Sequence, residues 1–183
     1  DDGIFITESH YLLSLIEENQ YDTIYHEHLR YYSLSSLNYL FNKYNMEIIF
    51  AKRIPTHGGS IRVYAAKKNQ HKIDNNYLEL IDYENKELFC KGLYNFKYKV
   101  IQSKLKLYSL LNEIKNNDLK VYGISAPSRA TTLINYVGIN VDILDCILEI
   151  QGSQKIGNFL RRKLRRPFSS QWPCRRPSCR CRV

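Results

Sequence analysis

The fold is decided by the stretch at positions 46–66, which reads Met-Glu-Ile-Ile-Phe-Ala-Lys-Arg-Ile-Pro-Thr-His-Gly-Gly-Ser-Ile-Arg-Val-Tyr-Ala-Ala. Its two ends, Met46–Phe50 and Ile61–Ala66, are rich in β-branched and aromatic residues, a composition typical of strands. Between them, Pro55–Ser60 holds a proline, two glycines and a serine, which favour a loop. The stretch therefore predicts two strands joined by a loop, in an antiparallel hairpin-like pair.

The residues before this stretch extend the pattern to an α/β sheet. Ile4–Thr7 predicts a buried strand and Tyr11–Glu17 a short helix. Ser33–Ser36 is a good helix N-cap region, and apolar residues follow it at helical spacing. The order strand, helix, strand, loop, strand suits the second half of an α/β sheet. Because the chain opens in a core strand, we expect that protein sequence upstream of it has been lost.

The residues after position 66 predict a linker, a helix and a second small domain. Lys67–Asn76 is polar, and Tyr77–Asn116 has the apolar periodicity of one long, charged helix with a solvated face. A strand over Leu119–Ile124, a helix over Ala130–Val137 and a strand over Ile143–Ile150 then follow. This order predicts a βαβ unit of Rossmann type.

The net charge of +9 comes entirely from the last 23 residues. Positions 161–183 hold nine lysines and arginines and no acidic residue, so the remaining 18 basic residues balance all 18 acidic ones. The body of the chain is therefore not a basic nucleic-acid binder. The body of the chain is rich in Lys and Asn, whereas positions 161–183 are rich in Arg, Pro and Cys, a change that resembles one from AT-rich to GC-rich coding. We therefore expect that positions 161–183 are a non-native tail.

The alternative is a protein that binds a nucleotide sugar or nucleic acid through this basic tail, or a tail that carries a metal through Cys174, Cys179 and Cys181. That cysteine spacing matches no common zinc pattern and lacks a fourth ligand nearby. The sequence shows no signal peptide and no apolar run of 18 residues, so we expect a soluble, cytoplasmic protein without a membrane partner.

Two clusters hold the residues most suited to chemistry. The first reads Tyr25-His26-Glu27-His28, and the second is His57 within the glycine loop. Histidine is the side chain whose pKa lies nearest neutrality, and a neighbouring carboxylate can orient it as a base. The alternatives are a polar surface turn, or a metal site built from His26, His28 and His57.

Three further features are weaker indications of a ligand-binding site. The two glycines of the loop would let the backbone approach a ligand closely. Arg62, inside a strand, contacts a carboxylate or phosphate or lies on the outer face. Gly123–Thr132 joins a strand to a helix, where Arg129 could pair with an anion, but it matches no phosphate-binding motif.

Five short stretches of sequence, taken together, indicate a protein family more specifically than any one of them alone. They are Tyr21–Leu29, Tyr31–Leu34, Ile54–Arg62, Ser125–Pro127 and Thr132–Tyr136, in this order. Over roughly residues 1–159 the chain resembles the S-adenosylmethionine-dependent sugar C-methyltransferases of nucleotide-deoxysugar biosynthesis. The resemblance implies the C-terminal part of a Rossmann-like class I methyltransferase sheet (1–68), a linker and long helix (69–118) and part of a Rossmann-like C-terminal domain (119–160).

The resemblance also implies the chemistry. Such enzymes methylate the carbon next to the ketone of a nucleotide-linked 4-keto deoxysugar through an enolate. His28 would be the base, with Glu27 and Tyr25 supporting it, and His57, Arg62 and His26 would lie near the substrate. The loop that binds S-adenosylmethionine would lie upstream of Asp1, so we expect the chain alone to be inactive. The family usually has Lys-Gly near Arg129, which weakens an anion-binding role there.

Overall fold

The computed structural model describes residues 2–88, 92–125 and 127–148. The elements in chain order, with two short 3₁₀ turns named η, are β1 (Ile4–His10), α1 (Leu12–Glu17), η1 (Tyr21–Thr23), α2 (Leu34–Lys43), β2 (Met46–Ile54), η2 (Thr56–Gly58), β3 (Ser60–Lys67), α3 (Asn75–Glu87), α4 (Leu93–Asn116), β4 (Tyr122–Ile124), α5 (Ser128–Val137) and β5 (Cys146–Leu148). The predicted tail, its cysteines and Ile150 lie outside the described residues.

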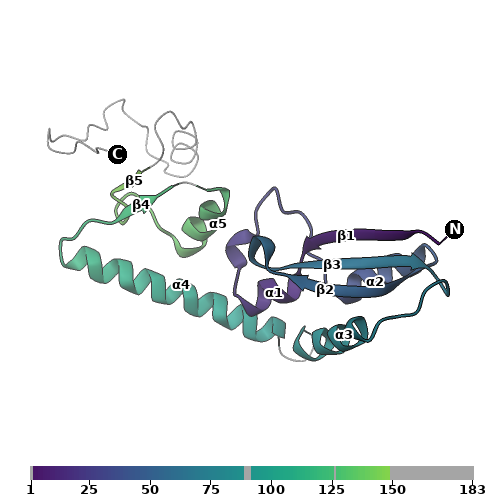
Figure 1. Cartoon of the computed structure of the whole chain (residues 1–183). Coiled ribbons are helices and arrows are strands. Elements are labelled where there is room, and N and C mark those ends of the chain that lie inside the picture. Colours follow the sequence, from purple (N-terminus) through teal and green to yellow (C-terminus); the bar gives the residue numbers. More distant parts are fainter. Residues whose placement is uncertain (1, 89–91, 126, 149–183) are drawn as a thin grey trace.

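A three-stranded sheet forms the first part of the molecule (Figure 1). Its order is β1-β3-β2, and β3 pairs antiparallel with both neighbours. The predicted hairpin of β2 and β3 is therefore confirmed. Because β3 runs against both, β1 and β2 point the same way, and their carboxyl ends meet at one edge of the sheet.

The core of this part lies between the sheet and the helices α2 and α3. Alternate side chains of β3 point into it, and Ile61, Val63 and Ala65 are fully buried. Leu34, Leu37 and Phe41 of α2 pack against them. The predicted N-cap is confirmed, because Ser33 and Ser36 form a reciprocal capping box at the start of α2.

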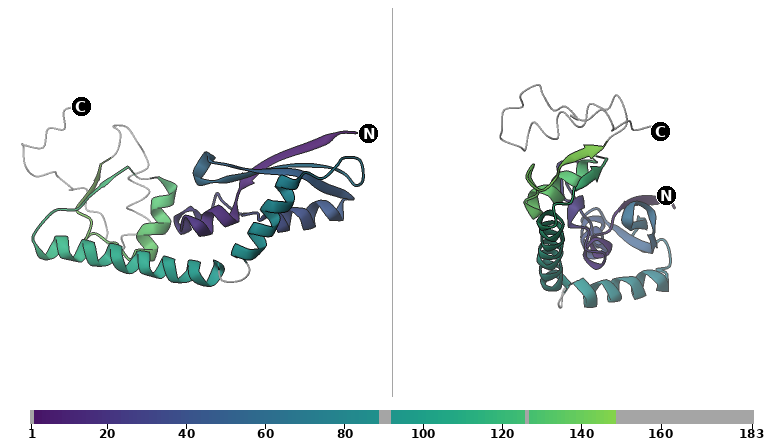
Figure 2. Two further views of the ribbon diagram at one scale, coloured as in Figure 1. Left: turned by 60° about the horizontal axis from the view of Figure 1, so that its bottom comes forward. Right: turned by 90° about the vertical axis from the view of Figure 1, so that its left-hand side faces the viewer.

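The single helix predicted over Tyr77–Asn116 is wrong, because the structure has two helices, α3 and α4, in its place. They run in clearly different directions (Figure 2, right). Gly92 precedes α4, and a Cβ there would lie 2.2 Å from the carbonyl oxygen of Glu87 at the end of α3. A glycine thus permits a close approach of the two helix ends that periodicity alone does not reveal.

The second part of the molecule is the β4-α5-β5 unit, which lies beside α4 (Figure 1). β4 and β5 pair in parallel, as the predicted βαβ unit requires. Both strands begin three residues later than predicted, at Tyr122 and Cys146. Within the part of the chain that the structure describes, no helix is long and apolar enough to cross a membrane.

Candidate functional site

The candidate site lies at the carboxyl ends of β1 and β2. β1 ends at His10, and β2 leads directly into the loop that carries His57. The segment after η1 brings Tyr25 and His28 to the same place, where the rings of His10 and His28 are 4.5 Å apart. In open α/β sheets, ligands bind outside the carboxyl ends of the strands. β1 and β2 present their carboxyl ends here, whereas β3 runs the other way.

Two contacts orient the ring of His28. Its Nδ1 lies 3.1 Å from the carbonyl oxygen of Thr23, which can only accept a hydrogen bond, so Nδ1 carries the proton. Nε2 of the neutral ring then carries no proton, and it accepts a hydrogen bond from the hydroxyl of Tyr25, which lies 3.3 Å away. The ring is therefore held in the tautomer that presents a basic nitrogen next to a hydroxyl.

Thr23 anchors this arrangement, because its side chain is buried and its carbonyl accepts from two residues. The hydroxyl of Tyr31 donates to the same oxygen over 2.6 Å, alongside His28. The Thr23 hydroxyl donates in turn to the carbonyl of Gln20 over 2.8 Å. Burial and the nearby carboxylate of Glu27 raise the pKa of Tyr25, so its hydroxyl stays protonated.

His10 is a member of the cluster that sequence reasoning missed. Its ring centroid lies 4.5 Å from that of His28, 6.2 Å from that of Tyr31 and 6.3 Å from that of His57. Burial first, and then the charges of His28, His57 and Arg129, lower the pKa of His10. A single histidine three positions after the predicted strand Ile4–Thr7 carries no local signal of this role.

The glycine loop is fixed against α1. The φ angles of Gly58 and Gly59 are +85° and +114°, which favour glycine. A Cβ at Gly59 would lie 2.5 Å from the Cβ of Ser14, and one at Gly58 would lie 2.8 Å from the Gln20 amide. The glycines thus let the loop pack closely against Ser14 and Gln20 of the same chain. This packing places His57 next to His10.

The other predicted site residues, Arg62, His26 and Glu27, lie in charged pairs of their own. Arg62 on β3 binds Glu8 of β1 through Nε and Nη2, at 3.0 and 2.8 Å, so its carboxylate partner comes from its own sheet. Glu8 also accepts from Thr56, the neighbour of His57, over 2.9 Å. The Glu27 carboxylate lies 3.8 Å from Nε2 of His26, and both side chains are largely exposed.

Arg129 binds a carboxylate, where the sequence analysis allowed an anion. Its Nε and Nη2 donate to the two oxygens of Asp22, at 3.1 and 2.9 Å. The carboxylate belongs to η1, more than a hundred positions earlier in the chain.

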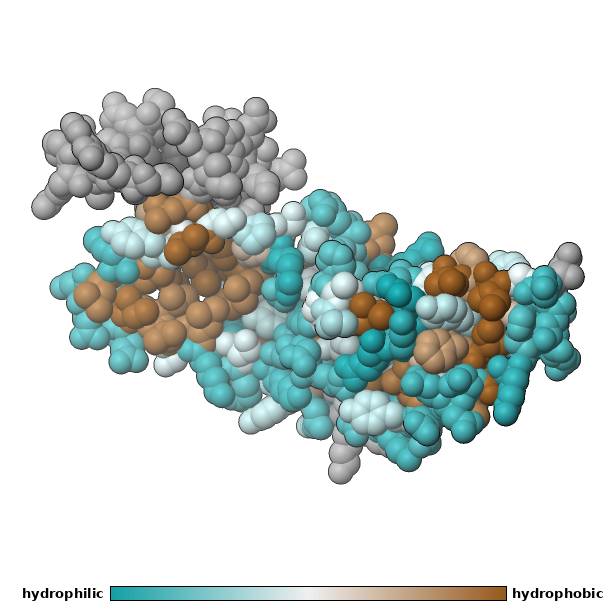
Figure 3. Space-filling model, in the orientation of Figure 1, coloured by the Kyte–Doolittle hydropathy of each residue, from teal (hydrophilic) through white to brown (hydrophobic). Residues whose placement is uncertain are grey.

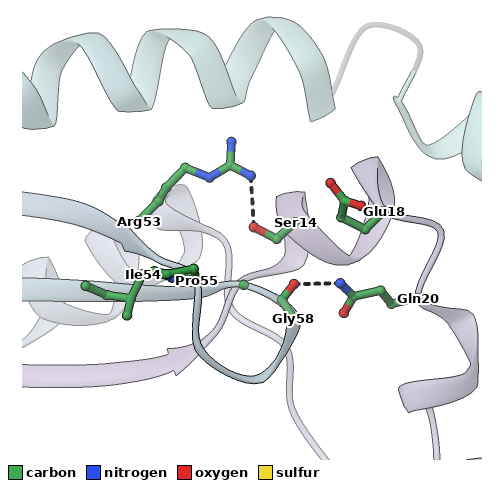
Figure 4. A pocket seen from close by; sticks show the side chains of 8 residues that line it. Ser14, Glu18, Gln20, Arg53, Ile54, Pro55 and Gly58 are labelled. Carbon is green, nitrogen blue, oxygen red and sulfur yellow. Dashed lines mark hydrogen bonds between the residues drawn. The ribbon is translucent and has the colours of Figure 1, made fainter.

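A pocket of about 450 Å³ adjoins the glycine loop on the side of α1 (Figure 4). Arg53 lines it, but its guanidinium donates to Ser14 over 3.0 Å and is paired with Glu17. Glu18 also lines the pocket, so the arginine charge is already balanced. Among the described residues, no group of three or more His, Cys, Asp or Glu is placed to hold a metal ion.

The comparisons with known proteins identify the family. The model of the C-methyltransferase C-terminal domain matches residues 55–164, more than half of the chain. The chain belongs to this C-methyltransferase family. It is also similar to C-methyltransferase NovU from Streptomyces niveus, with 29% identity over 141 residues, which cover 75% of this chain and 34% of that protein.

The family match includes part of the candidate site. His57 and Arg62 lie within the matched residues, whereas Tyr25, Glu27 and His28 lie before them. The chain spans about a third of the length of the C-methyltransferase that it matches. It therefore corresponds to a C-terminal portion of such a protein.

Proposed function

We propose that this chain forms the base-bearing part of an S-adenosylmethionine-dependent C-methyltransferase that acts on a nucleotide-linked 4-keto deoxysugar. One observation carries the proposal most directly. His28 is held with a bare Nε2 beside the Tyr25 hydroxyl, at the carboxyl ends of β1 and β2. Membership of the C-methyltransferase family supports the reaction class.

The proposed reaction starts with proton removal. The ketone acidifies the neighbouring C–H, and Nε2 of His28 takes this proton. When the sugar binds, the hydroxyl of Tyr25 turns from Nε2 to the keto oxygen, where it donates a hydrogen bond to the developing negative charge. A well-placed donor of this kind can contribute several kcal/mol. S-adenosylmethionine would supply the methyl group to the enolate carbon and would leave as S-adenosylhomocysteine. His28 afterwards releases its proton to water.

The remaining site residues are assigned supporting roles. Glu27, two positions after Tyr25, adds its charge to the effect of burial, and together they raise the pKa of Tyr25 and hold its hydroxyl protonated. His57 and His26 line the approach to the base. Arg62 acts through Glu8 and Thr56, which tie the His57 loop to the sheet.

We also propose that the three-stranded sheet is part of a larger class I methyltransferase sheet, followed by a Rossmann-like domain around β4-α5-β5. Ile4, Phe5 and Ile6 of β1 are each about half exposed. Hydrophobic side chains gather over this end of the molecule in Figure 3. A groove of about 370 Å³ beside them is lined by Phe5, Thr7 and Ser9 of β1 and by apolar residues of α2. Further strands of the sheet would cover such a surface.

Proton exchange tests the proposed function without a methyl donor. The chain is incubated in D₂O with thymidine diphosphate-linked 4-keto-6-deoxyglucose, and deuterium at carbon 3 is followed by NMR. We expect enzyme-dependent exchange, which the substitution His28→Gln lowers by about 100-fold or more. The control is His71→Gln, which alters a histidine outside the site.

Two results would overturn the proposal. One is the absence of exchange above the rate without protein, together with no binding of the sugar nucleotide by calorimetry. The other is equal exchange by the protein and its His28→Gln variant. Addition of nucleic acid is expected to leave exchange unchanged, since the proposed site involves no nucleic-acid partner.

A further inference from the structure

The segment that orients His28 is itself held by α5. Tyr21, Asp22 and Ile24 surround Thr23, whose carbonyl receives the Nδ1 proton of His28. Each of these three residues contacts a residue of α5. The proposed base, His28, is thus connected to the βαβ unit through the short backbone stretch 21–24.

The contacts to α5 are specific. Asp22 accepts two hydrogen bonds from Arg129, in a paired geometry that fixes direction as well as distance. The hydroxyl of Thr132 donates to the carbonyl of Ile24 over 2.9 Å. The rings of Tyr21 and Tyr136 meet edge to face with their centroids 5.4 Å apart.

α5 is in turn supported by α4. The Nζ of Lys104 lies 5.1 Å from the centroid of the Tyr136 ring, on the α4 side. A cation over an aromatic face is attracted by the ring quadrupole. The two helices lie side by side in both views of Figure 2. The position of η1 therefore depends on residues more than a hundred positions later in the chain.

We propose that Arg129 and Thr132 are positioning residues for the base, and that α5 sets the place of the Thr23 carbonyl and hence the direction of the His28 ring. This inference rests on the proposed function of His28. Arg129 acts through Asp22 and touches no substrate.

Charge and exposure agree with this role. Arg129 lies near enough to the cluster for its positive charge to help burial and the charges of His28 and His57 to lower the pKa of His10, and to oppose the rise in the pKa of Tyr25 that burial and Glu27 cause. The side chains of Arg129 and Asp22 are 44% and 29% exposed. An ion pair so open to water contributes little to global stability, so its removal is expected to leave the fold intact.

A double-mutant cycle tests the inference, with the same deuterium exchange as the readout. We expect Arg129→Gln and Asp22→Asn each to lower kcat by about tenfold, because a small displacement of a base costs rate, while KM changes by less than about twofold. The double variant is expected to be no slower than the slower single variant, since both changes break one contact.

Further variants separate position from charge. Thr132→Val, which removes only the hydroxyl bound to Ile24, is expected to lower kcat in the same direction. Arg129→Lys keeps the charge and is expected to restore part of the rate. The matched control is Asn135→Ala, an exposed change on the same helix. Single variants with kcat within about twofold of the parent, or losses that multiply in the double variant, would overturn the inference.

A second readout does not depend on activity. The Nδ1 proton of His28, bound to the Thr23 carbonyl, is followed by NMR in the parent and in Arg129→Gln. We expect its signal to shift or to exchange faster with water in the variant. An unchanged signal overturns the inference. If the parent protein shows no deuterium exchange, the proposed function fails, and this signal alone decides whether α5 positions the ring.

Discussion

His10 ends β1 with its ring against His28, in surroundings that oppose a charge on it. We predict that His10 titrates below the ordinary value of 6.5 for histidine, because burial and the charges of His28, His57 and Arg129 all lower its pKa. Since the unfolded chain binds this proton more readily, the free energy of unfolding should fall as pH decreases through 6.5 and should level off below the pKa of folded His10.

NMR titration of the histidine ring protons checks this prediction. In His28→Asn one source of repulsion is lost, so the pKa of His10 is expected to move up toward 6.5, while burial keeps it below that value. His71→Gln, away from the cluster, is the matched control. A His10 that titrates at or above 6.5 in the parent protein would contradict the prediction.

Single residues of the site were predictable where a local string carried them. Tyr25 and His28 lie three positions apart in such a string, and a turn suffices to bring them together, with His28 N donating to the Tyr25 carbonyl over 3.0 Å. His10 was not predictable, because its role comes from ring contacts with His28 and His57, which lie far from it in the sequence. The role of Thr23 was missed because it lies mainly in the backbone carbonyl, which no side-chain pattern reports. The pairing of Arg129 with Asp22 spans 107 positions, and no local rule reports such a contact.

At the scale of an element, α2 is held by a carboxylate from α3. Glu84 is fully buried and accepts from the backbone N–H groups of Leu34 and Ser35, at 2.5 and 2.8 Å, and from the Ser35 hydroxyl. A negative charge at a helix N-terminus is favourable, and these N–H groups have no partner within the helix.

We predict that Glu84→Gln lowers the free energy of unfolding by about 1–3 kcal/mol, because hydrogen bonds to a charged group are replaced by weaker ones in a buried place. Urea denaturation followed by circular dichroism measures the change. Glu79→Gln, an exposed change on the same helix, is the control and is expected to stay within about 0.5 kcal/mol. Equal effects of the two substitutions would show that the buried carboxylate does not hold α2.

The elements themselves were predictable wherever periodicity and caps agreed. The Ser33 capping box and the alternation in β3 both depend on neighbouring residues, so the sequence reveals them. The break between α3 and α4 was missed because apolar spacing continues through it. The starts of β4 and β5 were predicted too early, because the apolar residues just before them lie outside the paired segment.

At the scale of the whole molecule, Asp145 connects the end of α4 with the β4-β5 pair. Its carboxylate accepts from the backbone N–H of Val121 over 2.8 Å and from Lys115 of α4 over 3.0 Å. The hydrogen bond from Val121, with Lys115 and Lys120, lowers the pKa of Asp145 to about 2.

We predict that this connection is present above pH 4 and is lost as pH falls toward about 2, because the unfolded carboxyl takes up its proton near 3.8 and the folded one only near 2. Carbon-13 NMR of the aspartate carboxyls gives the titration directly. In Asp145→Asn the corresponding acid-dependent part of the stability should disappear. A folded Asp145 that titrates near 3.8 would contradict the prediction.

The arrangement of the whole molecule was the least predictable part. The sequence indicated the strands of the first sheet, but nothing in Ile61–Ala66 shows that β3 lies between β1 and β2. The docking of α5 on η1 likewise depends on polar pairs whose members look like ordinary surface residues in the sequence. Local patterns of apolar residues predict the fold class, whereas the order of the strands depends on how their surfaces pack together.

The central place of β3 has a consequence for how the protein is made. β3 is the last of the three strands to leave the ribosome, yet it supplies the pairing of both others. At about 5–20 residues per second, β1 waits several seconds after its own synthesis before Lys67 has been added. During this interval β1 and β2 cannot join into the sheet. The speed of translation across the codons for residues 11–67 therefore sets how long chaperones and other nascent chains can bind them.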